Sequence, residues 1–265
     1  MKKLRLDEEL VAQGFFSNKQ DALRAVLAGE VSTDSRKLTS AGERVKPGIY
    51  LHVKGHLPYV SRGGFKLEGG LDTFKVDPLS LKCLDVGCST GGFTDCLLKR
   101  GASSVTSVDV GYAQFDWSLR NNDKVELLER TNICDVSGEG YDNSYDLAVC
   151  DVSFTSVSVI LPSVVNLLKE DGMFLTLVKP QFECKREEVG QGGIVRDKQV
   201  RLATLTSVAN SFVEEGLDCL GACVSSITGT KGNVEFLLLG KKTQGSATCN
   251  LDLESVVYEG IAQIK

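Results

Sequence analysis

The stretch LDVGCSTGGF, from Leu84 to Phe93, decides the fold of this chain. Its first residues read as the end of a buried strand, and the small residues after them turn the chain into a helix. Small residues let the backbone approach a ligand closely, and a helix N-terminus offers free N–H groups to a carboxylate. A dinucleotide loop would read G-x-G-x-x-G, whereas here Gly87, Ser89 and Gly92 stand at those places. The loop therefore favours the methionine end of S-adenosylmethionine over a nicotinamide dinucleotide.

Apolar strands alternate with helix-length segments on both sides of this loop. The strands expected from the pattern are residues 82–86, 104–108, 125–128, 146–150, 173–178, 220–227 and 234–239. Such alternation indicates a mostly parallel sheet with helices on both faces. The predicted fold class is α/β: a Rossmann-like, seven-stranded class I methyltransferase domain preceded by a small α+β domain. The boundaries that we expect are 1–58 for the small domain, 59–81 for a linker and extension, 82–245 for the methyltransferase domain and 246–265 for a tail with a packed helix.

Composition places the chain among ordinary globular proteins. It has 265 residues, of which 42% are hydrophobic and 25% charged. No apolar run approaches the ~18 residues of a membrane helix, and charges occupy the N-terminus where a signal peptide has its apolar core. We expect a cytoplasmic protein that does not bind membranes. Nine cysteines without C-x-x-C spacing and two histidines predict neither a metal site nor disulfides.

The charge is unevenly distributed along the chain. Residues 1–58 hold ten Lys or Arg and seven Asp or Glu, a net charge of +3, whereas the whole chain carries −5. A basic segment joined to an acidic domain is typical of a module that guides nucleic acid. An excess of three charges can also arise by chance.

The N-terminal segment contains two expected helices, residues 4–13 and 21–28, and two short β pieces, residues 31–33 and 49–53. It resembles the S-four (α-L) RNA-binding domain in the following residues: Arg5-Leu6-Asp7, Leu10, Gly14, Ser17, Ala22, Gly29 and Val31. The resemblance implies RNA contacts by these basic residues: Arg5, Lys19, Arg24, Arg36 and Lys37. Two departures are Asn18-Lys19 for the usual arginine and Ser32-Thr33-Asp34 for the usual Val-Asn-Gly turn. A solvated helix face is the alternative interpretation of each cation.

Acidic and amide side chains at strand ends extend the expected cofactor site. Asp109 ends the second strand, where a carboxylate can accept hydrogen bonds from ribose hydroxyls in either class of cofactor. Asn132 is expected at the adenine edge and Asp85 at the cofactor ammonium group, although ordinary loop chemistry would also explain both. The complete expected set is Asp85, Gly87, Ser89, Thr90, Gly91, Gly92, Phe93, Asp109, Asn132 and Asp151.

Four charged residues stand where a core should exclude them: Lys66, Asp151, Lys179 and Glu235. We expect them to converge at the carboxyl edge of the sheet, where open α/β sheets bind ligands. Because isolated burial of a charge is costly, they should satisfy one another. A surface ion pair is the alternative for any one of them. Arg62 with Gly63-Gly64 either clamps a phosphate or is a plain linker.

Lys-Asp-Lys-Glu in this order resembles the catalytic tetrad of the FtsJ-like ribose 2′-O-methyltransferases. The surrounding strings are similar to the TlyA family: Tyr59-Val60-Ser61-Arg62-Gly63-Gly64-Phe65-Lys66-Leu67, STGGFTD, Asp109-Val110-Gly111-Tyr112, Glu129-Arg130-Thr131-Asn132, Asp151-Val152-Ser153-Phe154 and Lys179-Pro180-Gln181-Phe182-Glu183. This resemblance implies S-adenosylmethionine-dependent 2′-O-methylation of cytidine in ribosomal RNA. The implied partner is ribosomal RNA or a ribosomal subunit, without an obligate protein partner. Cys88 and Cys134 depart from the family pattern.

Lys179 is the expected base that removes the proton of the ribose hydroxyl, with Asp151 and Glu235 orienting the two lysines. In the alternative, Lys179 only steers the hydroxyl. Members of the family also carry hemolysin names, but the most apolar stretch, residues 157–168, contains Pro162 and reads as a core helix. A non-catalytic RNA-binding assembly factor is the remaining alternative. Base methylation is disfavoured because Asp151-Val152-Ser153-Phe154 is not an Asn-Pro-Pro-Tyr-like loop.

Overall fold

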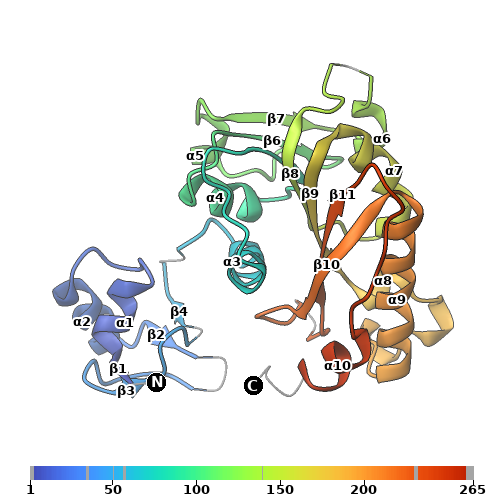
Figure 1. Cartoon of the computed structure of the whole chain (residues 1–265). Coiled ribbons are helices and arrows are strands. Elements are labelled where there is room, and N and C mark those ends of the chain that lie inside the picture. Colours follow the sequence, from blue (N-terminus) through green and yellow to red (C-terminus); the bar gives the residue numbers. More distant parts are fainter. Residues whose placement is uncertain are drawn as a thin grey trace. The chain divides into compact units, whose positions relative to one another are not determined.

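A seven-stranded sheet lies at the centre of the larger part of the protein (Figure 1). Its strands lie side by side in the order β10 (Leu217–Val224), β11 (Phe236–Lys242), β9 (Leu168–Val178), β8 (Tyr145–Cys150), β5 (Lys82–Val86), β6 (Ser104–Asp109) and β7 (Val125–Glu129). The pairs from β9 to β7 are parallel, and β11 is antiparallel to both of its neighbours. This order confirms the predicted mostly parallel, seven-stranded α/β fold.

The computed structural model describes residues 3–33, 36–49, 51–55, 58–138, 140–229 and 232–260. The chain divides between Val60 and Ser61 into two units. The helices of the second unit are α3 (Gly63–Phe74), α4 (Gly92–Lys99), α5 (Trp117–Arg120), α6 (Ile133–Val136), α7 (Val157–Leu167), α8 (Pro180–Glu183), α9 (Lys198–Glu214) and α10 (Leu253–Tyr258). Figure 1 shows α3 and α4 on one side of the sheet and α6, α7 and α9 on the other.

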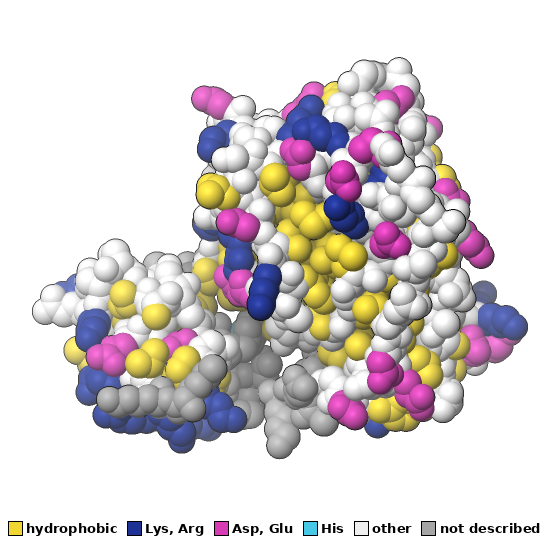
Figure 2. Space-filling model, viewed as in Figure 1, with side chains coloured by type: hydrophobic (Ala, Val, Ile, Leu, Met, Phe, Trp, Pro, Cys, Tyr) yellow, Lys and Arg dark blue, Asp and Glu magenta, His cyan; other side chains and the backbone are white. Residues whose placement is uncertain are grey.

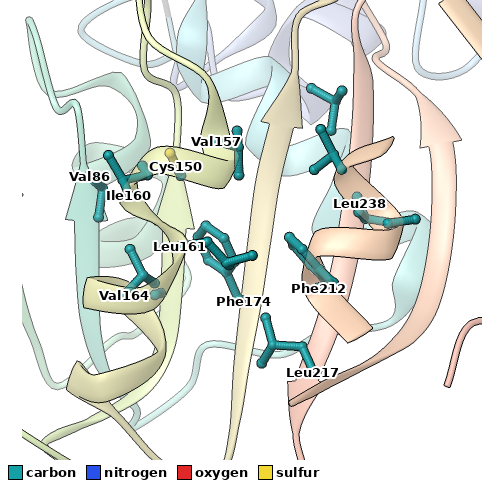
Figure 3. Close-up of a cluster of buried hydrophobic side chains, with 14 of the residues drawn as sticks. Val86, Cys150, Val157, Ile160, Leu161, Val164, Phe174, Phe212, Leu217 and Leu238 are labelled. Atoms are coloured by element: carbon teal, nitrogen blue, oxygen red, sulfur yellow. The ribbon is translucent and has the colours of Figure 1, made fainter. Parts of the chain in front are cut away.

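The core between the sheet and α7 explains why the apolar stretch near residue 160 is a helix. Its buried residues recur at helical spacing: Val157, Ile160, Leu161, Val164 and Leu167. Figure 3 shows this face of α7 directed at Phe174 of β9, whose ring lies 5.4 Å from the ring of Phe212 on α9. Within the described residues, no helix has the length and apolarity needed to cross a membrane.

The N-terminal unit contains α1 (Leu6–Ala12), α2 (Lys19–Leu27) and two short antiparallel sheets. One sheet pairs β1 (Leu4–Arg5) with β3 (Arg44–Val45), and the other pairs β2 (Val31–Ser32) with β4 (His52–Val53). Asn18 begins α2 because its side chain accepts hydrogen bonds from the backbone N–H groups of Gln20 and Asp21.

The strand boundaries differ from the expected ones in two places that matter for the site. β1 occupies the start of the expected first helix because Leu4 and Arg5 pair with β3, a strand that the pattern did not predict. β11 begins at Phe236, so Glu235 precedes the strand instead of lying within it. Phe236 pairs with Val178, and this antiparallel register brings the start of β11 beside the end of β9.

Candidate functional site

The loop between β5 and α4 has two glycines in left-handed backbone with close neighbours. Gly87 has φ of 77°, and a Cβ there would lie 3.2 Å from the Cα of Val152. Gly91 has φ of 93°, and its Cβ would lie 2.5 Å from Leu119 Cδ1. Left-handed backbone combined with such close neighbours excludes larger residues. The loop therefore lies tightly against the loop that follows β8.

Asp109 fixes the other side of this loop. Its carboxylate accepts hydrogen bonds from the backbone N–H of Ser89 at 2.7 Å and of Gly111 at 2.6 Å. Asn132 begins α6 and accepts a hydrogen bond from the N–H of Cys134 at 3.1 Å. Asp109 and Asn132 line one cavity of about 480 Å³, as the expectation of a shared adenosine-binding side requires. The remaining lone pairs of Asp109 are available to ribose hydroxyls, which fits an adenosyl group.

A second cavity of about 690 Å³ adjoins the first at the carboxyl edge of the sheet. The two share a wall that consists of Gly87, Ser89, Asp151, Ser153 and Phe154. Of the loop residues in the expected cofactor set, this larger cavity is lined by Gly87, Ser89, Thr90, Gly92 and Phe93. A ligand with an adenosine end and an amino-acid end can thus extend across the shared wall.

All four residues of the expected tetrad line the larger cavity, where they form two ion pairs. Lys66 Nζ donates to Glu235 Oε2 at 2.6 Å, and the two side chains are 11% and 4% exposed. Lys179 Nζ lies 2.5 Å from Asp151 Oδ1, with side-chain exposures of 8% and 22%. This second contact is an ion pair between two largely buried side chains. Lys66 lies on α3, Asp151 and Lys179 follow β8 and β9, and Glu235 precedes β11.

Lys179 has further partners that the sequence did not predict. Its Nζ lies 3.0 Å from Ser153 Oγ and 5.9 Å from the centre of the Phe182 ring. Phe154 packs against Phe182 with ring centres 5.1 Å apart, yet Phe154 is 91% exposed and has φ of 66°. An aromatic residue in left-handed backbone is strained, and such strain gathers at functional sites. Ser153, Phe154 and Phe182 all lie in sequence strings that resemble the TlyA family, so the resemblance was the signal that could have identified them.

Glu183 is a second unpredicted residue, and it joins the loops after β8 and β9. Its Oε2 accepts a hydrogen bond from Ser156 Oγ at 2.6 Å, and its Oε1 accepts one from the N–H of Val157 at 2.9 Å. Burial raises the pKa of this carboxyl. A carboxylate at the start of α7 also faces the positive end of the helix dipole. Glu183 thereby holds the two loops that carry Asp151 and Lys179.

Asp85 does not lie where the sequence placed it. Its side chain is fully buried behind the loop, lines neither cavity and accepts a hydrogen bond from Thr94 Oγ1 at 2.6 Å. Thr94 Oγ1 also lies 2.7 Å from Ser107 Oγ. The other carboxylate oxygen of Asp85 has no hydrogen-bond partner among the described residues. Burial raises the pKa of Asp85 to about 7, and the hydrogen bond from Thr94 opposes this rise.

Because Asp85 is buried, we expect the free energy of unfolding to fall as the pH rises from about 4 to 7. Asp85 titrates near 3.8 when exposed, so in this window the folded chain holds a proton that the unfolded chain has lost. Between pH 5 and 7 the loss is roughly 2 to 3 kcal/mol. Urea unfolding of the wild type and of Asp85→Asn at several pH values measures it. The asparagine variant, which is always neutral, should lack this slope; an equal slope in both proteins contradicts the assignment.

The predicted RNA-binding cations lie in different surroundings. Four are paired with carboxylates: Arg5 with Asp7, Lys19 with Glu8, Arg24 with Asp21, and Arg36 with Glu43. Lys37 is exposed, and Arg62 lines the larger cavity of the second unit. The structure therefore brings Arg62 to the tetrad, while the other five belong to the N-terminal unit. Among the described side chains, no group of His, Cys, Asp or Glu is suited to hold a metal ion.

Comparison with known proteins finds similarity over the whole chain. A family model described as FtsJ-like methyltransferase matches residues 59–242. YqxC of Bacillus subtilis, which carries an rRNA methyltransferase name, is 44% identical over 270 residues, covering 100% of this chain and 96% of that protein. The 16S/23S rRNA (cytidine-2′-O)-methyltransferase TlyA of Mycobacterium tuberculosis is 38% identical, covering 99% of this chain and 98% of that protein. A solved structure from Streptococcus thermophilus, which carries a hemolysin name, is 38% identical with a TM-score of 0.73, covering 100% and 96% of the two chains.

Proposed function

The chain belongs to the FtsJ-like methyltransferase family, and from this premise we propose that it transfers a methyl group from S-adenosylmethionine to the 2′-hydroxyl of cytidine in ribosomal RNA. The proposal rests on two ion pairs, Lys66 with Glu235 and Lys179 with Asp151. Both line a cavity beside the glycine-rich loop. Similarity to proteins named as rRNA methyltransferases supports the choice of substrate.

The cofactor is held by the loop and by Asp109 in this proposal. Asp109 and Asn132 line the smaller cavity, where Asp109 would accept hydrogen bonds from the ribose hydroxyls and Asn132 would face the adenine. The loop from Gly87 to Phe93 would hold the amino-acid end of the cofactor in the larger cavity. When bound, S-adenosylmethionine supplies an electrophilic methyl group. Asp85, which is buried behind the loop, supports Thr94 of α4 instead of touching the ligand.

Lys179 acts on the ribose hydroxyl. Asp151 and Ser153 hold its Nζ at the wall shared by the two cavities. As the base, Lys179 would accept the proton of the 2′-hydroxyl, which makes the ribose oxygen the nucleophile. In the alternative, the charged ammonium donates a hydrogen bond that orients the hydroxyl. Lys66, held by Glu235, lines the same cavity and adds a second positive charge.

The exposed ring of Phe154 is a surface on which the base of the target nucleotide can stack. Its ring is exposed and stands beside Phe182, which in turn lies next to Lys179. Proteins that recognise unstacked RNA bases commonly stack them on aromatic side chains. A cytosine stacked on Phe154 would place its ribose near the lysine.

The test uses purified protein, S-adenosylmethionine with a labelled methyl group, and ribosomal particles from a strain that lacks the gene. We expect label in ribosomal RNA, and mass spectrometry of the digested nucleosides should identify 2′-O-methylcytidine. Separate reactions with small subunits, large subunits and protein-free RNA show which particle is the substrate. Absence of label from every RNA contradicts the proposal, and a label on the base instead of the ribose replaces it with base methylation.

A further inference from the structure

The ribbon formed by β1 and β3 presents four cations on one face. Leu4 pairs with Val45 and Arg5 pairs with Arg44 in antiparallel register. Side chains directly opposite in such a pair share a face, and successive residues alternate between faces. Leu4 and Val45 therefore point to the inner face, where Val45 is buried. The outer face carries the exposed side chains of the following residues: Lys3, Arg5, Arg44 and Lys46.

The cations of this outer face are poorly compensated. Only Arg5 is paired with a carboxylate, that of Asp7, within the described part of the unit. Arg44 donates a hydrogen bond to the backbone oxygen of Lys3 at 3.1 Å, so these two residues lie side by side. Figure 2 shows Lys and Arg gathered along the edge of the N-terminal unit where β1 and β3 lie. Like charges opposite each other destabilise a ribbon, so a polyanion that binds here relieves repulsion.

The cations of α2 and of the following loop are different, because carboxylates already neutralise them. Glu8 holds Lys19 at 2.8 Å and Asp21 holds Arg24 at 3.1 Å, while Glu43 pairs with Arg36. A phosphate that bound these side chains would have to compete with the carboxylates. Among the described residues, Lys37 is the one cation of this set of four without a carboxylate partner, whereas the ribbon face has three such cations of four.

We propose that the outer face of the β1–β3 ribbon, through Lys3, Arg44 and Lys46, binds the phosphate backbone of the RNA substrate. The inference rests on the proposed function and adds the surface by which the RNA is held. An RNA backbone fits better than an anionic membrane, because the apolar side chains of the ribbon point inward and leave none to enter a lipid surface. Contacts of this kind position the RNA without reading its sequence.

The main experiment compares the triple variant Lys3→Gln, Arg44→Gln, Lys46→Gln with the wild type in filter binding to ribosomal RNA across a range of salt concentrations. We expect an affinity loss of roughly 10- to 100-fold at moderate salt. The slope of log affinity against log salt should become shallower by about 2 to 3, since each lost phosphate contact removes roughly 0.7 to 0.9. In the methylation assay the KM for RNA should rise while kcat and cofactor binding stay the same.

Two further triple variants decide whether the face itself matters. The charge-matched control is Lys75→Gln, Lys124→Gln, Lys198→Gln, which removes three exposed cations of the second unit; it should bind RNA within about 3-fold of the wild type. The variant Lys19→Gln, Arg24→Gln, Arg36→Gln should lose less affinity than the ribbon variant. Equal losses in all three variants, or a larger loss in the α2 variant, overturn the proposal.

The RNA-binding readout separates this inference from the proposed activity. If the wild type binds RNA through the ribbon but transfers no methyl group, the proposed function fails and the ribbon inference stands. If methylation occurs and the ribbon variant binds RNA normally, only the ribbon inference fails. Vesicles that contain phosphatidylglycerol test the other polyanion: binding that the ribbon variant loses, with unchanged RNA affinity, assigns the face to membranes and overturns the proposal.

Discussion

Lys179→Ala is expected to lower the rate of methyl transfer by about 10³-fold, because a positioned proton acceptor contributes roughly 10²- to 10⁴-fold. Asp151 and Ser153 hold its Nζ in the larger cavity. Single-turnover transfer of a labelled methyl group to RNA measures the chemical step. Cofactor affinity, measured by calorimetry, should change little, since the residues assigned to cofactor binding remain.

Two variants sharpen this prediction. Lys169→Ala is the matched control, because Lys169 also forms an ion pair with an aspartate, Asp146 at 2.6 Å, at the opposite end of β9; it should keep normal activity. Lys179→Arg retains the positive charge but cannot accept a proton near neutral pH. If Lys179 is the base, the arginine variant is as inactive as the alanine variant. Substantial activity of the arginine variant would show that Lys179 orients the hydroxyl, and full activity of Lys179→Ala would refute both roles.

Glu235→Ala is expected to lower the free energy of unfolding by about 3 to 5 kcal/mol, because it leaves the ammonium of Lys66 nearly buried and unpaired. The double variant Lys66→Met, Glu235→Leu removes both charges and should recover most of that loss. Urea unfolding followed by circular dichroism measures both changes. A double variant as unstable as the single one would show that the ion pair is not the origin of the effect. Both variants should lose methyl transfer, since Lys66 and Glu235 line the cavity.

The edge of the sheet at which the site forms could be predicted from the sequence. Asp109 ends β6, and Asp151 and Lys179 directly follow β8 and β9, so these polar residues meet at one edge because the strands run parallel. Which charges pair could not be predicted, because Lys66 meets Glu235 only through the register of β11 against β9. That register is set by packing over the whole strand and not by the residues near Glu235.

Two expectations show that the position of a residue in the sequence does not by itself give its neighbours in the structure. Asp85 was placed at the ligand because it precedes the loop, but successive side chains in a strand point to opposite faces. Leu84 and Val86 point to the core shared with α7, and Asp85 therefore points to Thr94 on α4. In the N-terminal segment, the sum of charges gives a net charge of +3 but does not reveal which cations are paired with nearby carboxylates.

The ion pair between Lys66 and Glu235 joins residues 169 positions apart. This separation determines when the pair can form while the chain is being synthesised. The N-terminal unit has all of its residues once about the first 60 are made, and such units can fold while translation continues. The tetrad is different, because β11 must insert between β9 and β10 before Glu235 reaches its place. A nascent chain thus acquires its reaction centre only after β11 has been made. In our proposal, a protein that modifies ribosomal RNA is therefore inert until the ribosome that makes it has added Glu235 and β11.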